Sequence, residues 1–230
     1  MEVVFVHGAL VRDGQWWWQP TATLLEERTG VRSRSVALPS CGETGERGGL
    51  EADAVALRAV LDEVGDAVLV GHSYGGTVIA EAGRHAAVRH LVLVSSYLPD
   101  VGQAQAQIMA DEPDPVAVVD AGDGLVAVDG YDSARFGARF LQDAADAVQR
   151  AAWERVTTQS IAALGTPTTD AGWRGVDSIY LVCTADRSTS IGLQREHAGR
   201  ASRSVDLATG HHPFITRPDL VVEVLAPLVT

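Results

Sequence analysis

The segment that most constrains this chain is Gly71-His72-Ser73-Tyr74-Gly75-Gly76, a Gly-x-Ser-x-Gly sequence. It follows the apolar run 67–70 and precedes a pattern typical of a helix at 77–82. A strand, a sharp turn and a helix in this order hold the central serine in a strained conformation at the tip of a sheet. We expect Gly71 and Gly75 to be required because a Cβ at either position would clash with a neighbouring strand or helix. The motif predicts a nucleophilic hydroxyl on Ser73 beside free N–H groups at a helix N-terminus.

A serine that only caps the following helix would fit the same motif, so the partners of Ser73 have to decide its role. A nucleophilic serine needs a base to take its proton and an acid to orient that base. We therefore looked for histidine and carboxylate side chains at the same edge of the predicted sheet.

Composition limits the other classes of protein that this chain could form. At 230 residues with 46% hydrophobic residues, the chain is expected to be a single domain with a large core. No apolar run approaches the ~20 residues that span a bilayer, and the N-terminus has the pattern of a first strand rather than a signal peptide, so we expect a cytoplasmic protein. The net charge of −12 argues against binding to nucleic acid or to anionic membranes. Cys41 and Cys183 are expected to be reduced thiols.

Short apolar strands alternate with helical patterns along most of the chain. Strands are predicted at 2–6, 31–38, 67–70, 90–95, 179–183 and 204–207, and helices at 16–28, 50–64, 74–85 and 214–228. This alternation indicates an α/β fold whose parallel sheet is covered by helices on both faces. Such sheets place their active sites at the carboxyl ends of the strands, where Ser73 is expected.

The interval 98–175 breaks this alternation. It has helical patches near 135–142 and 144–156 but no clear period around 120–132. We interpret residues 98–175 as a small, mainly helical cap inserted after the fourth strand, and residues 1–97 and 176–230 as the core. The alternative is a surface insertion that takes no part in the site. Such a cap would cover Ser73 and exclude water from a substrate pocket.

The search for a base leads to Gly210-His211-His212-Pro213-Phe214. This segment follows the last predicted strand, so one of its two histidines can reach Ser73 at the carboxyl edge. Among the other histidines, His7 is expected to shape a loop facing Ser73, His72 to pack beside the turn, and His85, His90 and His197 to lie at the surface.

The search for an acid favours Asp186, which leaves the fifth predicted strand at the same edge of the sheet. A carboxylate there can accept the second ring N–H of the histidine and stabilise the imidazolium. Asp100, after the fourth strand, is the competing acid. A helix cap or a salt bridge with Arg187 is the alternative role for Asp186.

The order serine, aspartate, histidine is that of the α/β-hydrolase fold, and the details resemble one branch of it. This branch is the small esterase group related to plant methyl esterases and hydroxynitrile lyases, with its bacterial relatives. The resemblance spans nearly the whole chain and is carried by these segments: Phe5-Val6-His7-Gly8-Ala9, the tryptophans at 16–18, Leu38-Pro39, the Ser73 motif, Tyr97-Leu98-Pro99, Gln159-Ser160, Cys183-Thr184-Ala185-Asp186-Arg187, Gln194-Arg195 and Gly210-His211-His212-Pro213-Phe214.

The resemblance implies a mostly parallel sheet of six strands in the order 2-1-3-4-5-6. It makes His211 the catalytic histidine and assigns the oxyanion hole to the backbone N–H groups of Ala9 and Tyr74. The lyase branch has a lysine where this chain has His212 and a threonine where it has Gly8. Both lyase residues are absent, which favours hydrolysis.

The expected function is hydrolysis of a carboxylic ester, lactone or thioester of a small, largely apolar substrate, without metal or cofactor. Cyanohydrin-lyase-like or other biosynthetic, non-hydrolytic chemistry and a receptor-like homologue that only binds ligand are the alternatives. A small-molecule ester is the expected partner, with a homodimer left open. Five residues are expected to contact substrate: Trp17, Trp18, Ile108, Trp153 and His212. For the first four, packing in the core is the alternative role.

Overall fold

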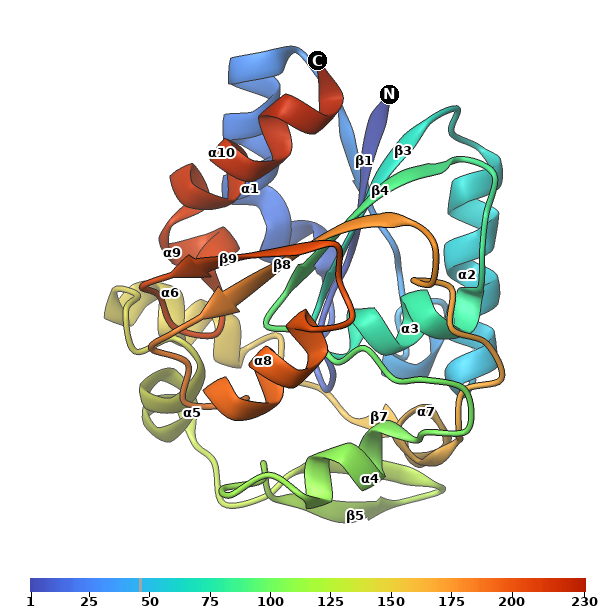
Figure 1. The fold of residues 1–230 in the computed structure, drawn as a ribbon. Coiled ribbons are helices and arrows are strands. Elements are labelled where there is room, and N and C mark those ends of the chain that lie inside the picture. Colours follow the sequence, from blue (N-terminus) through green and yellow to red (C-terminus); the bar gives the residue numbers. More distant parts are fainter. Residues whose placement is uncertain (46) are drawn as a thin grey trace.

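The computed structural model describes residues 1–45 and 47–230, and its centre is a parallel sheet (Figure 1). The sheet has six strands in the order β2-β1-β3-β4-β8-β9, which is the predicted order. The strands are β1 (Glu2–Val6), β2 (Ser33–Ser35), β3 (Ala67–His72), β4 (Val88–Val94), β8 (Asp177–Cys183) and β9 (Arg203–Leu207).

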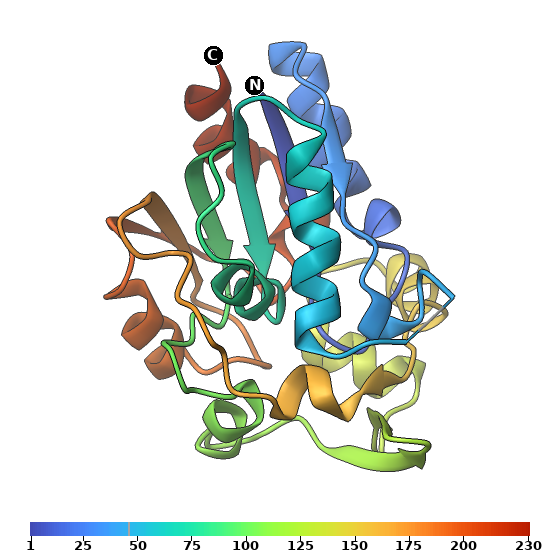
Figure 2. The same ribbon diagram turned by 90° about the vertical axis from the view of Figure 1, so that its right-hand side faces the viewer.

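Both faces of the sheet are buried, because successive side chains of a strand point to opposite faces. In β1, Val4 and Val6 join one apolar cluster, whereas Val3 and Phe5 join the other. The first cluster is completed by α2 (Leu50–Asp62), α3 (Gly75–Ala82) and α8 (Ile191–Ala198). The second is completed by α1 (Gly14–Thr29), α9 (Pro213–Thr216) and α10 (Pro218–Val229). The two helical layers lie on opposite sides of the sheet (Figures 1 and 2).

The chain between β4 and β8 crosses the carboxyl ends of the strands, toward which the arrows of the sheet point in both views. This segment includes residues 98–175, the interval for which the sequence predicts a cap. Its elements are α4 (Gln105–Ala110), β5 (Val118–Gly122), β6 (Leu125–Val128), α5 (Ser133–Phe140), α6 (Asp146–Trp153), β7 (Gln159–Ser160) and α7 (Ile161–Gly165). Helices predominate, as expected, but β5, β6 and β7 form a small antiparallel sheet that the sequence analysis did not predict.

Two other elements differ from their prediction. The strand expected at 31–38 is reduced to Ser33–Ser35 at the edge of the sheet, and a short 3-10 helix follows at Pro39–Cys41. The helix expected at 214–228 is split into α9 and α10 at Arg217. Pro218 lacks an N–H and forces the residue before it out of the helical region, so one continuous helix cannot pass through this point.

Candidate active site

Ser73 lies on the sharp turn between β3 and α3 with φ of 50°, in the left-handed region that residues with a Cβ rarely adopt. Its carbonyl oxygen accepts hydrogen bonds from the N–H groups of Gly76 (3.2 Å) and Tyr97 (3.0 Å). The Ser96 hydroxyl donates a third at 3.0 Å. The strained turn is therefore held by the segment that follows β4.

Close backbone approaches explain the glycines around Ser73. A Cβ on Gly71 would lie 2.6 Å from Ile79 Cδ1 of α3, and one on Gly75 would lie 2.4 Å from the Val6 carbonyl oxygen of β1. These are the clashes expected from the sequence. Gly76 adds a third, because its Cβ would lie 1.9 Å from the Tyr97 carbonyl oxygen.

His211 and Asp186 meet at the same edge of the sheet, on the loops that follow β9 and β8. His211 Nδ1 lies 2.7 Å from Asp186 Oδ2, and the two side chains are 3% and 0% exposed. Because an ionised carboxylate only accepts hydrogen bonds, Nδ1 carries the proton. This tautomer leaves Nε2 of His211 with a lone pair that can accept a proton.

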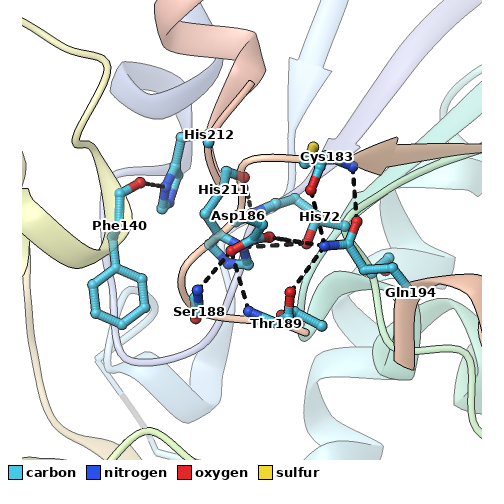
Figure 3. A network of polar contacts seen from close by, with 12 residues as sticks. His72, Phe140, Cys183, Asp186, Ser188, Thr189, Gln194, His211 and His212 are labelled. Atoms are coloured by element: carbon cyan, nitrogen blue, oxygen red, sulfur yellow. Dashed lines mark hydrogen bonds and ion pairs between the residues drawn. The ribbon is translucent and has the colours of Figure 1, made fainter. Parts of the chain in front are cut away.

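Asp186 accepts four further hydrogen bonds, part of a network that Figure 3 shows from close by. Ser95 Oγ donates to Oδ2 at 2.5 Å, and Gln194 Nε2 donates to the same oxygen at 3.2 Å. The N–H groups of Ser188 and Thr189 donate to Oδ1 at 2.7 and 3.1 Å. Each donor favours the ionised carboxylate.

The balance of these contacts determines the charge of Asp186. Burial alone would raise the pKa of this carboxyl, but the charge of His211, its hydrogen bond and those of Ser95 and Ser188 outweigh burial and lower the pKa. Ser95 itself has φ of 40° and stands directly after β4. The sequence analysis missed Ser95, although its place at a strand's carboxyl end was a signal.

Ser73 and His211 line one cavity, which has a volume of about 60 Å³ and is partly open to solvent. The residues that line it are Gly8, Ala9, Leu10, Val11, His72, Ser73, Tyr97, Gln105, Met109, Val116, Val128, Phe136, Phe140, Ser188, His211 and His212. Most of the cap residues in this wall are apolar. Within the described residues Ser73 Oγ makes no hydrogen bond, and such contacts commonly tighten only when substrate binds.

The structure places the predicted substrate-contacting residues differently. His212 lines the cavity, but four others do not: Trp17, Trp18, Ile108 and Trp153. The cap contributes instead Gln105, Met109 and Phe140, among others. The sequence analysis missed these residues because the short cap elements give no regular apolar period.

The neighbouring tryptophans of α1 have different surroundings, since successive residues of a helix do not face the same way. Trp18 stacks between Phe5 and Phe214, with ring centroids 4.4 and 4.0 Å away, and belongs to the core. Trp17 stacks on the ring of His212 at 5.0 Å and so lies behind the cavity wall.

Two buried histidines brace the loop that carries His211. His72 Nε2 donates to the His211 carbonyl oxygen at 3.0 Å, and His212 Nδ1 donates to that of Phe140 at 2.8 Å. Burial and the charge of His211 lower the pKa of His72 well below its ordinary value and that of His212 to about 3. Both rings are therefore neutral near pH 7.

The predicted oxyanion donors lie beside Ser73. Tyr74 follows it directly, and Ala9 lines the cavity. The loop of Ala9 comes close to the turn, because a Cβ on Gly8 would lie 3.3 Å from Ser73 Cβ. In the part of the chain that the structure describes, neither the Ala9 nor the Tyr74 N–H donates to a protein acceptor.

The sequence of this chain matches a known protein family. The model of the alpha/beta hydrolase family matches residues 3–224. The chain belongs to this family. It is 26% identical over 217 residues to the alpha/beta hydrolase nvfD of Aspergillus novofumigatus, with 83% of this chain and 82% of that protein covered.

Solved structures share the alpha/beta hydrolase fold with this chain. A pyrethroid hydrolase from Sphingobium faniae superposes with a TM-score of 0.80 at 22% identity, covering 100% of this chain and 97% of that one. A methylesterase from Arabidopsis gives a TM-score of 0.78 at 17% identity, covering 100% and 98%. These likenesses show that the chain has the alpha/beta hydrolase fold.

Other polar residues of this alpha/beta hydrolase have partners outside the cavity. Asp100, the competing acid, pairs with Arg174 at 2.5 Å near the surface. His7 pairs with Glu43 at 2.7 Å and with the Gly8 carbonyl oxygen at 2.9 Å, as a residue that shapes the loop would. His197, expected at the surface, is only 1% exposed, because it lies on the inner side of α8 near Tyr97.

Across residues 1–45 and 47–230, no group of three or more histidine, cysteine, aspartate or glutamate side chains is placed to hold a metal ion. None of the described helices combines the length and apolar character needed to cross a bilayer.

Proposed function

We propose that this alpha/beta hydrolase cleaves a carboxylic ester, lactone or thioester of a small, largely apolar substrate, with Ser73 as nucleophile, His211 as base and Asp186 as orienting acid. One observation carries the proposal. A serine on a strained strand-to-helix turn shares a largely apolar cavity with a histidine whose other ring nitrogen donates to a buried, ionised aspartate.

In the first half-reaction Ser73 Oγ attacks the acyl carbon while His211 Nε2 takes the hydroxyl proton. The oxygen of the former carbonyl becomes an oxyanion, to which the Ala9 and Tyr74 N–H groups donate. Such a donor typically contributes about 3 kcal/mol of transition-state stabilisation. The bond to the leaving group then breaks, and the His211 proton passes to the departing oxygen or sulfur.

In the second half-reaction water replaces the alcohol or thiol. His211 takes a proton from water, whose oxygen attacks the acyl-enzyme. The bond from Ser73 Oγ to the acyl carbon breaks, and the proton returns to Ser73. Asp186 keeps Nδ1 of His211 protonated in both halves and stabilises the imidazolium.

The cavity wall supports the substrate class. Met109, Val116, Val128 and Phe136 come from the cap and offer apolar surface opposite the polar groups of the core. A narrow cavity with a mostly apolar wall suits a small apolar acyl or alcohol group. We therefore keep the division into a core of 1–97 and 176–230 and a cap of 98–175 that shapes the substrate site.

Turnover of p-nitrophenyl esters from acetate to octanoate tests this proposal. Wild type should release p-nitrophenol, with kcat/KM rising with chain length until the acyl group exceeds the cavity. Ser73→Ala should abolish release, whereas Ser204→Ala, at an exposed position on β9, should not change it. Full turnover by Ser73→Ala would contradict the proposal. Retention of ester by wild type without turnover would instead indicate a binding protein.

A further inference from the structure

A chain of buried polar side chains runs beneath the Ser73 turn, on the side away from Asp186. Tyr74 OH donates to Asp53 Oδ2 at 2.6 Å. Ser40 donates to the same carboxylate through its hydroxyl (2.6 Å) and its N–H (2.9 Å). Gln159 Nε2 donates to Ser40 Oγ at 2.9 Å, and Gln159 Oε1 accepts from the Leu10 N–H at 2.9 Å.

The two ends of this chain are the two sides of the proposed oxyanion hole. Tyr74 supplies one N–H, and Leu10 follows Ala9, which supplies the other. Tyr74, Asp53, Ser40 and Gln159 are all 0% exposed. Polar groups buried this deeply cost stability unless they are fully hydrogen-bonded, and here each is paired.

The Ala9 side of the hole is also tied to the cap through the backbone. The Thr157 N–H donates to the Leu10 carbonyl oxygen at 2.9 Å, and the Arg12 N–H donates to that of Arg155 at 2.9 Å. Leu10 has φ of 60°, a left-handed conformation that is unfavourable for leucine. With Gln159 on one side and Thr157 on the other, the cap segment 157–159 holds this strained residue in place.

Asp53 contrasts with Asp186 in its partners. Burial raises the pKa of Asp53, although hydrogen bonds from Ser40 and Tyr74 and the charge of His7 act in the opposite direction. The same burial, with the nearby Asp53, raises the pKa of Tyr74 well above its ordinary value, so Tyr74 stays protonated and donates.

We propose that Asp53 and Gln159 are positioning residues that set the Tyr74 and Ala9 N–H groups at the separation an oxyanion requires. The inference rests on the function proposed above. Neither side chain lines the cavity that Ser73 and His211 share. They act through Tyr74 and Leu10, and Gln159 makes the assembly of the hole depend on the cap.

Gln159→Leu and Tyr74→Phe test this role, because each removes hydrogen bonds of the chain while preserving volume and every backbone N–H. Loss of a whole oxyanion donor lowers kcat by about 10² to 10³, so a displaced donor should lower it about 10- to 100-fold, with KM within about threefold. Affinity for a trifluoromethyl ketone, whose adduct with Ser73 carries an oxyanion, should fall by the same factor. Affinity for the matching methyl ketone and the acid limb of the kcat/KM pH profile should not change.

Thr168→Val is the matched control, since it removes a buried hydrogen bond to the Asp100 carbonyl oxygen in another part of the cap. It should leave kcat within about twofold at a similar loss of thermal stability. The inference is overturned if Gln159→Leu and Tyr74→Phe both fold and keep the wild-type kcat and ketone affinity. If Gln159→Leu does not fold, Tyr74→Phe alone decides. Absence of Ser73-dependent turnover in wild type would instead refute the proposed function.

Discussion

Two buried carboxylates flank the Ser73 turn, and they differ in the charge of the groups that contact them. Asp186 faces His211. Burial would raise the pKa of Asp186, but the positive charge that His211 carries when protonated and the hydrogen bonds that Asp186 accepts lower it. Asp53 has only hydroxyl and N–H donors in direct contact, and burial raises its pKa. A charged partner suits a group that must stabilise an imidazolium, whereas neutral donors suit a group that holds backbone in place. In the proposed reaction Asp186 therefore supports proton transfer, whereas Asp53 holds the backbone donors in position.

The largest effect should come from Asp186. Asp186→Asn keeps the size of the side chain but removes the charge and presents the wrong tautomer to His211. In a triad this change lowers kcat by about 10⁴. Asp53→Asn should lower kcat by only about 10- to 100-fold, since it disturbs the positions of donors. Equal losses of kcat in Asp186→Asn and Asp53→Asn, measured by steady-state kinetics, would contradict different roles for the two carboxylates.

The stability advantage of wild type over Asp186→Asn and its advantage over Asp53→Asn should change with pH in opposite directions. The lowered pKa of Asp186 means that its contribution is present above the unfolded-state pKa near 4 and is lost as pH falls through the folded pKa. The raised pKa of Asp53 means that its contribution is present below the unfolded-state pKa and is lost as pH rises through the folded pKa.

Urea unfolding from pH 3 to pH 8 measures this difference. The stability advantage of wild type over Asp186→Asn should shrink toward low pH, and its advantage over Asp53→Asn should shrink toward high pH. Each unit of pKa difference corresponds to about 1.4 kcal/mol. If the stability advantage of wild type changed with pH in the same way for both variants, the opposite pKa shifts of Asp186 and Asp53 would be contradicted.

Ser95 offers a smaller test on the Asp186 side. Ser95→Ala removes the 2.5 Å hydrogen bond to Asp186 Oδ2 but leaves the donors on Oδ1. We expect kcat to fall about tenfold with little change in KM, because the carboxylate loses one of several restraints. Unchanged kcat would show that the remaining donors position Asp186 on their own.

The smallest effect is expected at His212. Its pKa of about 3 keeps the ring neutral during turnover. His212→Asn should therefore leave the acid limb of the kcat/KM pH profile in place, even if KM changes, because only protonation of His211 blocks the base. A shift of that limb by one pH unit would show that His212 takes part in proton transfer.

The site residues that sequence patterns predict most directly are those set by local rules. The strand, turn and glycines around Ser73 predict its position, and the convergence of parallel strand ends predicts Asp186 and one of the two histidines 211 and 212 at the same edge. The choice of His211 came from the family resemblance. The alternation of strands and helices predicted a parallel sheet covered on both faces, and the family resemblance supplied the strand order. These features depend on backbone topology, which sequence patterns express directly.

The features that the sequence analysis missed depend on tertiary packing. The cap strands β5 to β7 are short, and the cavity residues Met109 and Phe136 lie on short elements without a strong period. Asp53 carried a usable signal, because it lies on the buried side of α2 together with Leu50 and Leu57. A carboxylate on an apolar helix face requires hydrogen-bond donors, but the sequence does not say that Tyr74 and Ser40 supply them.

In the proposed reaction Ser73 is a nucleophile that His211 activates. Intact-mass analysis after treatment with a fluorophosphonate, followed by peptide mapping, tests it most directly. We predict one adduct per wild-type chain, located on Ser73, no adduct on Ser73→Ala, and labelling of His211→Ala slowed by several orders of magnitude. Labelling at another residue would show that Ser73 is not the nucleophile, and equal rates in wild type and His211→Ala would show that His211 does not activate it.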